Sequence, residues 1–185
     1  MDRPVKERAS FTAMADGTAE DYRKVQVVAQ LEARELPDRL LAFLAGLEGT
    51  GGFLISRLEH SLQSATRALR DGRDDEYVVC ALLHDIGDTL APFNHSEIAS
   101  AVLRPFVSEG NRWMVEHHAV FQTYYYNHHF GLDKNVRDKF VGSPFYQQTV
   151  EFCELYDQNC FDPSYDNMSL DEFDPILRRV LAQKE

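Results

Sequence analysis

Residues 77–87 read YVVCALLHDIG, and this stretch decides the fold of the chain. An unbroken apolar run extends from Tyr77 to Leu83, so a helix formed here is hydrophobic all round and must be buried. We predict this helix over about 76–86. The C-terminal end of this helix carries His84 and Asp85. Burying an ionisable group costs on the order of several kcal/mol unless the group is paired or binds a metal.

Helical periodicity recurs on both sides of this stretch, whereas the alternation typical of a half-buried strand is not sustained. Thr18 is predicted to cap the first helix, Leu54 to lie on the inner face of the third, and Asp174 to cap the last, with Pro175 at its first position. The fold class predicted is therefore all-α, a helical bundle. The other helices are expected over 18–31, 37–47, 53–69, 94–106, 111–125, 145–159 and 175–183.

The length and composition are those of one globular domain. The chain has 185 residues, of which 44% are hydrophobic and 26% charged, and this size is sufficient to close a core. Residues 1–17 show no sustained period and are predicted to form an N-terminal arm, followed by a single helical domain over 18–185. Cys80, Cys153 and Cys160 are odd in number and form no C-x-x-C pair, so we expect buried thiols instead of a disulfide framework or zinc ribbon.

The charge and hydropathy exclude some partners. A formal net charge of −11 repels a polyphosphate backbone, so a nucleic acid is not expected as a partner. No apolar run approaches the roughly 20 residues that span a bilayer, and the N-terminus lacks the apolar core of a signal peptide. We therefore expect no membrane partner and a cytoplasmic location.

Ionisable residues suited to metal binding recur on separate predicted helices. Besides His84 and Asp85, the candidates are His60, His95, His118 and Asp157. Burying all six without a metal would be unfavourable, so together they predict a two-metal site. Imidazole and carboxylate ligands suit zinc, iron, manganese or nickel, and the lack of a well-placed thiolate argues against structural zinc. Three further histidines are not expected to be ligands: His117, His128 and His129.

The short motifs around these residues resemble a known family. Residues 81–87, ALLHDIG, and residues 58–62, LEHSL, are similar to segments of the mixed-valent di-iron oxygenases of the HD-domain superfamily, named for its His-Asp pair. Weaker similarity surrounds His95, His118 and Asp157. The resemblance covers roughly residues 60–157, and it implies an HD-domain helical bundle.

The resemblance also implies a reaction. It assigns His60, His84 and Asp157 to one iron, His95 and His118 to the other, and Asp85 to both, with His84 and Asp85 as the catalytic centre. His117 is the second choice in place of His118. The cofactor would be an Fe²⁺/Fe³⁺ pair, and the partners would be O₂ and a small organophosphonate. The expected reaction cleaves the C–P bond of a 1-hydroxy-2-(trimethylammonio or amino)ethylphosphonate to a carboxylate, such as glycine betaine, and phosphate.

Several positions depart from the family pattern and bear on the substrate. Gln122 stands where the family has a lysine and Asp88 where it has a histidine, and both are predicted to bind substrate. Tyr126 belongs to the aromatic run 121–126, whose rings either face the pocket and bind a trimethylammonium group or serve only helix packing. Thr50 and Phe53 stand where the family has a tyrosine and a glutamate, one of which is a gating ligand.

Three functions therefore stay open on the sequence alone. The leading one is the di-iron oxygenase. The first alternative is an HD-type metal-dependent phosphohydrolase acting on a nucleotide or phosphomonoester, in which the same metals would activate water. The second is a binding protein that retains the metals without turnover. The replacements at Thr50 and Phe53 leave this possibility open, because the family's gating residue is then absent unless Tyr22 takes its place. The nearest basic residues, Lys134, Arg137 and Lys139, are expected to be solvated surface charges.

Overall fold

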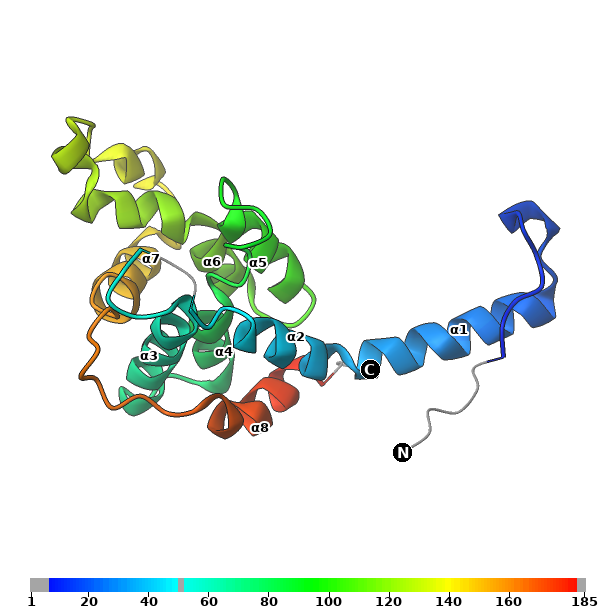
Figure 1. The fold of residues 1–185 in the computed structure, drawn as a ribbon. Coiled ribbons are helices and arrows are strands. Elements are labelled where there is room, and N and C mark those ends of the chain that lie inside the picture. The colour runs from blue at the N-terminus through cyan, green and yellow to red at the C-terminus, as the bar shows by residue number, and fades with distance from the viewer. Residues whose placement is uncertain (1–6, 50–51, 183–185) are drawn as a thin grey trace. The chain divides into compact units, whose positions relative to one another are not determined.

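The computed structural model describes residues 7–49 and 52–182 (Figure 1), and within these ranges the secondary structure is entirely helical. This confirms the all-α prediction. The α-helices are α1 (Ala19–Arg34), α2 (Leu36–Ala45), α3 (Arg57–Arg70), α4 (Asp75–Leu83), α5 (His95–Leu103), α6 (Glu109–Gln122), α7 (Tyr146–Phe152) and α8 (Leu170–Leu181). Shorter turns are the 3₁₀ helices η1 (Met14–Asp16), η2 (Thr123–Tyr125), η3 (Asn127–Phe130) and η4 (Val136–Phe140) and the π-helix η5 (Cys153–Asp157).

The chain divides into two compact units, Met1–Leu40 and Leu41–Glu185. In the first unit, Thr18 caps α1 as predicted, because its hydroxyl accepts from the N–H of Asp21 while the Asp21 carboxylate accepts from the N–H of Thr18. Asp21 also accepts from Ser10, which ties the preceding segment to the helix. The predicted division into an arm and one domain over 18–185 stays a prediction.

Helix α4 is the centre of the second unit. Every residue from Val78 to Leu83 is at most 1% exposed, and α4 packs against α3, α6 and α8. Figure 1 shows α3 and α4 side by side. This agrees with the prediction from the unbroken apolar run, because a helix with no polar face is stable only when other helices cover it on all sides.

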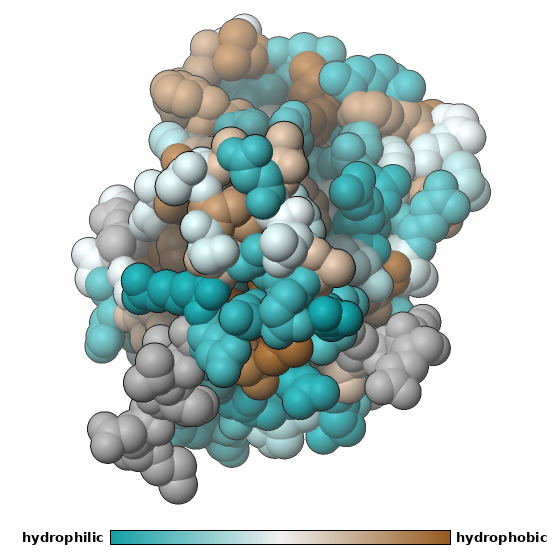
Figure 2. Space-filling model, turned by 90° about the vertical axis from the view of Figure 1, so that its right-hand side faces the viewer, coloured by the Kyte–Doolittle hydropathy of each residue, from teal (hydrophilic) through white to brown (hydrophobic). Residues whose placement is uncertain are grey.

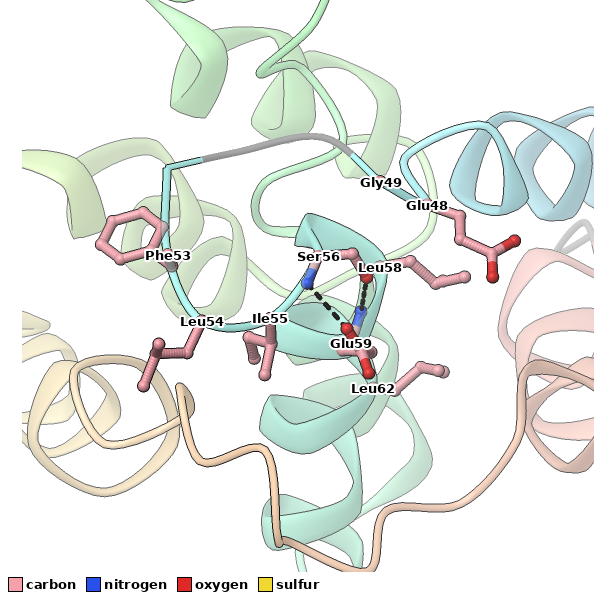
Figure 3. Close-up of a pocket in the computed structure, with 9 residues that line it drawn as sticks. All are labelled: Glu48, Gly49, Phe53, Leu54, Ile55, Ser56, Leu58, Glu59 and Leu62. Carbon is pink, nitrogen blue, oxygen red and sulfur yellow. Dashed lines mark hydrogen bonds between the residues drawn. The ribbon is translucent and has the colours of Figure 1, made fainter.

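The start of α3 differs from the prediction. The helix begins at Arg57 and not at residue 53, and Leu54, expected on its inner face, is 83% exposed. The reason is a capping box, drawn as dashed lines in Figure 3, in which Ser56 and Glu59 each accept a hydrogen bond from the other's N–H. This pair satisfies two N–H groups at a helix start, and residues before Ser56 therefore stay outside the helix.

The start of α8 also differs. Ser169 caps the helix, in a capping box with Glu172, so Asp174 is not the cap and Pro175 lies inside the helix instead of at its first position. Pro175 lacks the N–H that would bond to the carbonyl of Asp171, whereas the helix start is stabilised upstream by the capping box of Ser169 and Glu172. Ile176, Leu177 and Leu181 are buried on the inner face of the helix, where they pack against the rest of the unit. The predicted end of the helix, at Gln183, lies outside the described residues.

The surface is mixed in character. Figure 2 shows hydrophilic and hydrophobic residues interspersed over the face that it draws. Among the described helices, none is both long and apolar enough to cross a membrane.

Candidate metal centre

Six side chains predicted as ligands lie together in the second unit. His60 comes from α3, His84 is the C-cap residue directly after α4, and Asp85 lies in the turn that follows. The other three come from the first residue of α5, from α6 and from the last residue of η5: His95, His118 and Asp157. All of them except the half-buried His95 are at most 7% exposed. Helices distant in sequence thus present imidazole and carboxylate groups to one buried place.

The first group of ligand atoms surrounds His60. Its Nε2 lies 3.1 Å from Nε2 of His84 and 3.4 Å from Oδ1 of Asp157. Oδ2 of Asp85 faces the same group, at 3.5 Å from His60 Nε2 and 3.6 Å from His84 Nε2.

The second group lies on the other side of the Asp85 carboxylate. Nε2 of His95 and Nε2 of His118 are 3.3 Å apart. Oδ1 of Asp85 lies 3.3 Å from Nε2 of His95 and 3.1 Å from Nε2 of His118. Asp85 therefore directs one oxygen to each pair of histidines.

Hydrogen bonds fix the tautomers of the four imidazoles. Nδ1 of His60 lies 3.0 Å from a backbone carbonyl, and the corresponding distances for His84 and His118 are 2.7 and 2.6 Å. Nδ1 of His95 lies 3.2 Å from the carboxylate of Asp88. Carbonyl and carboxylate oxygens can only accept, so each Nδ1 carries the hydrogen and each neutral ring presents a lone pair at Nε2.

The centre consequently contains hydrogen-bond acceptors that face one another. Lone pairs at about 3 Å repel unless a proton or a metal lies between them. Two ligand atoms that are each about 2.1 Å from one ion are roughly 3.0–3.4 Å apart at tetrahedral or octahedral angles, and the shortest nitrogen–nitrogen distances here fall in that range. Oδ2 of Asp157 is also buried without a hydrogen-bond partner. The residues present therefore fit a bound metal.

The electrostatics agree with this interpretation. Burial lowers the pKa of His60 and His84, but the carboxylates of Asp85 and Asp157 outweigh it and the net shift is upward. Burial raises the pKa of both carboxyl groups, and the surrounding histidines reverse this and hold the pKa values below their usual range. Without metal, the rings of His60 and His84 favour protonation, and a metal ion would replace those protons.

Two backbone features position the ligands. A Cβ built on Gly87 would lie 2.5 Å from the backbone oxygen of His95, so only glycine lets the turn after α4 approach the start of α5 so closely. The helix that starts at Tyr146 changes to a π-helix at Cys153, where the N–H of Gln158 bonds to a carbonyl five residues back. Sequence reasoning predicted one regular helix over 145–159 and missed this π-turn, which ends on Asp157.

The residues predicted to bind substrate lie around the ligands. Gln122 donates from Nε2 to Oδ1 of Asp157 at 2.6 Å. Asp88 contacts His95 and forms an ion pair with Arg57. Tyr126 is 43% exposed and lines the cavity beside the centre. Their contact with a substrate, like the assignment of the six ligands, stays a prediction.

The cavity beside the centre has a volume of about 660 Å³. Its lining includes four of the candidate ligands: Asp85, His95, His118 and Asp157. Other parts of the lining are aromatic: Phe53, Tyr125, Tyr126, Phe130 and Phe161. Sequence reasoning missed Arg57, which also lines the cavity; the signal was its position one helical turn before His60, which places both on one face of α3.

A second hollow has different chemistry. It has a volume of about 490 Å³, and its lining residues in the described part of the chain all lie between Glu48 and Leu62 (Figure 3). Its two carboxyl residues are Glu48 and Glu59, and it has no histidine among its described lining residues. Thr50, the first of the two altered gate positions, lies outside the described residues, and Phe53 packs against Phe161 with ring centroids 4.4 Å apart.

The remaining candidates lie outside the ligand groups. His117 stacks on Trp113, and His128 and His129 are exposed on η3. That none of the three is a ligand stays a prediction. The three basic candidates lie over aromatic rings, Lys134 and Arg137 over Tyr124 and Lys139 over Phe140. The three cysteines are free and buried, as predicted. Tyr22 belongs to the first unit, where it donates to the carbonyl of Met14, and its gating role stays a prediction.

Comparison with known proteins adds no assignment: neither the protein-family models nor the curated proteins match this chain. The fold and the site define an all-helical protein with buried histidine and aspartate groups that can bind metal. This class is compatible with an HD domain and does not identify one. Imidazole and carboxylate donors of this kind suit several transition metals.

Proposed function

We propose that the protein is an O₂-dependent di-iron oxygenase with an HD-type helical domain, acting on a small hydroxylated organophosphonate. The observation that carries the proposal is the position of Asp85, whose two oxygens face two different pairs of histidines. A carboxylate shared in this way is suited to bridge two ions. The His84-Asp85 motif and the family-like spacing of the other ligands support iron.

Each residue has a defined part in this proposal. His60, His84 and Asp157 would hold one iron, His95 and His118 the other, and Asp85 both. When bound, the iron pair supplies one-electron chemistry toward O₂. Gln122 orients Asp157 through its amide hydrogen bond, and Asp88 orients His95 and holds its Nδ1 hydrogen. Such contacts to ligand residues fix ring orientation and strengthen metal binding.

The cavity supports a small zwitterionic substrate. Its volume of about 660 Å³ suits a small molecule. Tyr125, Tyr126 and Phe130 would place aromatic faces around an amino or trimethylammonium group. The proposed reaction consumes one O₂ and converts the hydroxyl-bearing carbon of R–CH(OH)–PO₃H₂ into R–COOH, with release of H₃PO₄. The atoms of both reactants are accounted for in these two products.

The test combines metal analysis with product analysis. Protein produced with ample iron is expected to contain two iron ions per chain, and to consume O₂ and release phosphate when a 1-hydroxy-2-(trimethylammonio)ethylphosphonate is added. The primary-amine analogue should react more slowly if the aromatic wall selects the quaternary ammonium group. Iron-loaded protein that neither consumes O₂ nor releases phosphate with either compound contradicts the proposal.

The main alternative is a phosphohydrolase, because the same ligands could hold two ions that activate water. Under nitrogen, the oxygenase is expected to be inactive. A phosphohydrolase would release phosphate from a nucleotide or phosphomonoester at an undiminished rate without O₂. Full metal content with no turnover in either assay would indicate a binding protein.

A further inference from the structure

Arg57 occupies a distinctive place in the cavity beside the metal centre. It is the first residue of α3 and lies one turn before His60. Of the described residues that line the cavity, it alone is a lysine or arginine. Its side chain is 29% exposed, so it is neither buried as a structural ion pair nor free in solvent.

The contacts of Arg57 hold it next to the centre. Its Nη1 lies 3.7 Å from Oδ2 of Asp85 and forms an ion pair with Asp88. Its guanidinium carbon lies 5.9 Å from the centroid of the Phe53 ring. Both ion pairs use Nη1, and no hydrogen bond to a described residue uses Nε or Nη2. The guanidinium therefore retains donors for a ligand in the cavity.

The charge of the centre favours an anionic ligand once metal is bound. Without metal, the cavity lining carries three negative charges, on the carboxylates of Asp85, Asp88 and Asp157, and one positive charge, on the guanidinium of Arg57. Two divalent ions would exceed the remaining negative charge and make the cavity wall positive. Arg57 would then be the protein's own donor on that wall, and its planar fork suits the oxygens of a phosphonate or phosphate better than a lysine would.

We propose that Arg57 is the anion anchor of this cavity and binds the phosphorus oxyanion of the small molecule that sits beside the metal centre. This rests on the proposed function in one respect, because it takes the cavity to be the substrate site. It does not depend on the fate of the C–P bond. The competing explanation is that Arg57 only holds Asp85 and Asp88 in place.

Anion binding can be measured without turnover. Metal-loaded protein would be titrated under nitrogen with methylphosphonate and, separately, with methyl phosphate, by calorimetry. Arg57→Gln removes the charge and the fork, and Arg57→Lys retains only the charge. Arg70→Gln is the matched control, because it makes the same change on an exposed arginine at the other end of α3, where Arg70 contacts Tyr165 and Asp166.

Arg57→Gln is expected to raise the dissociation constant of methylphosphonate roughly tenfold to a hundredfold, since one charge-assisted contact is lost. Arg57→Lys should cause a smaller increase, and Arg70→Gln none. Metal content is measured in every variant, and if Arg57→Gln lowers it, the comparison is made with Arg57→Lys. Preference for methylphosphonate over methyl phosphate would identify a phosphonate site, and the reverse a phosphate-ester site.

The outcomes separate this inference from the proposed function. Equal affinity in wild type and in a fully metal-loaded Arg57 variant overturns the anchor, as does wild-type protein that binds neither anion. Arg57-dependent binding by a protein that never consumes O₂ supports the anchor and rejects the oxygenase. Loss of metal in Arg57→Gln with unchanged affinity in Arg57→Lys would show that Arg57 acts only on Asp85 and Asp88.

Discussion

Nε2 of His60 and Nε2 of His84 lie 3.1 Å apart, and neither nitrogen carries a hydrogen when its ring is neutral, because Nδ1 of each ring donates to a backbone carbonyl. Two lone pairs in this arrangement repel unless a proton or a metal ion lies between them. The same relationship recurs at 3.3 Å between His95 and His118. This repeated geometry is the strongest structural argument for metal.

Asp85→Ala should remove the carboxylate that faces both histidine pairs. We expect metal content to fall from two ions to one or none per chain, and any spin-coupled mixed-valent signal in electron resonance to disappear. Metal analysis and resonance spectra check this. Asp133→Ala, at an acidic residue in an exposed loop, is the control and should leave both unchanged. A normal signal in the Asp85 variant would contradict the bridging role.

Metal affinity should fall in acid. The pKa values of His60 and His84 lie above the ordinary value of 6.5 in the metal-free protein, so protons compete with the ions already above that pH. Each imidazole that must release a proton weakens apparent affinity by about tenfold per pH unit below its pKa. Titration with Co²⁺, followed by visible absorption between about pH 6 and pH 8, measures the slope. A flat response would exclude these imidazoles as ligands.

Gly87→Ala should disturb the centre through the backbone. The added Cβ would meet the carbonyl oxygen of His95 at 2.5 Å, so the start of α5 must move. We expect a loss of about 1–3 kcal/mol in the free energy of unfolding together with weaker metal binding, as measured by denaturation and by metal analysis. At Gly142, a Cβ meets no atom within 4 Å, and Gly142→Ala should have little effect on either. Equal behaviour of the two variants would contradict the close approach.

The three thiols should be unreactive in the folded protein. Burial raises the pKa of Cys160 to about 12 and those of Cys80 and Cys153 well above the ordinary value of 9.0. Only the thiolate is nucleophilic, so a thiol reagent at about pH 8 should label none of them in native protein and all three in denaturant. Rapid labelling of one cysteine without denaturant would show that its helix opens readily.

Much of the fold was predictable because helix formation depends on neighbours in the sequence. The apolar run before His84 indicated the buried helix, and Thr18 marked a helix start, since a cap and its partner are three residues apart. The starts of α3 and α8 were predictable in principle from the same local chemistry. Both helices start with a capping box, formed by Ser56 with Glu59 in α3 and by Ser169 with Glu172 in α8. The predicted starts were placed instead from the apolar residue Leu54 and from Pro175.

The sequence by itself determined an all-helical chain and the residue types able to bind metal. The family resemblance also assigned His60 and His84 to one ion. Only the tertiary structure decided that each Nε2 is an acceptor and that Arg57 lines the cavity. The carbonyl that fixes the tautomer of His60 belongs to Cys160, 100 residues away. Such contacts arise when helices pack, and no local periodicity encodes which side chains then meet or which way their lone pairs point.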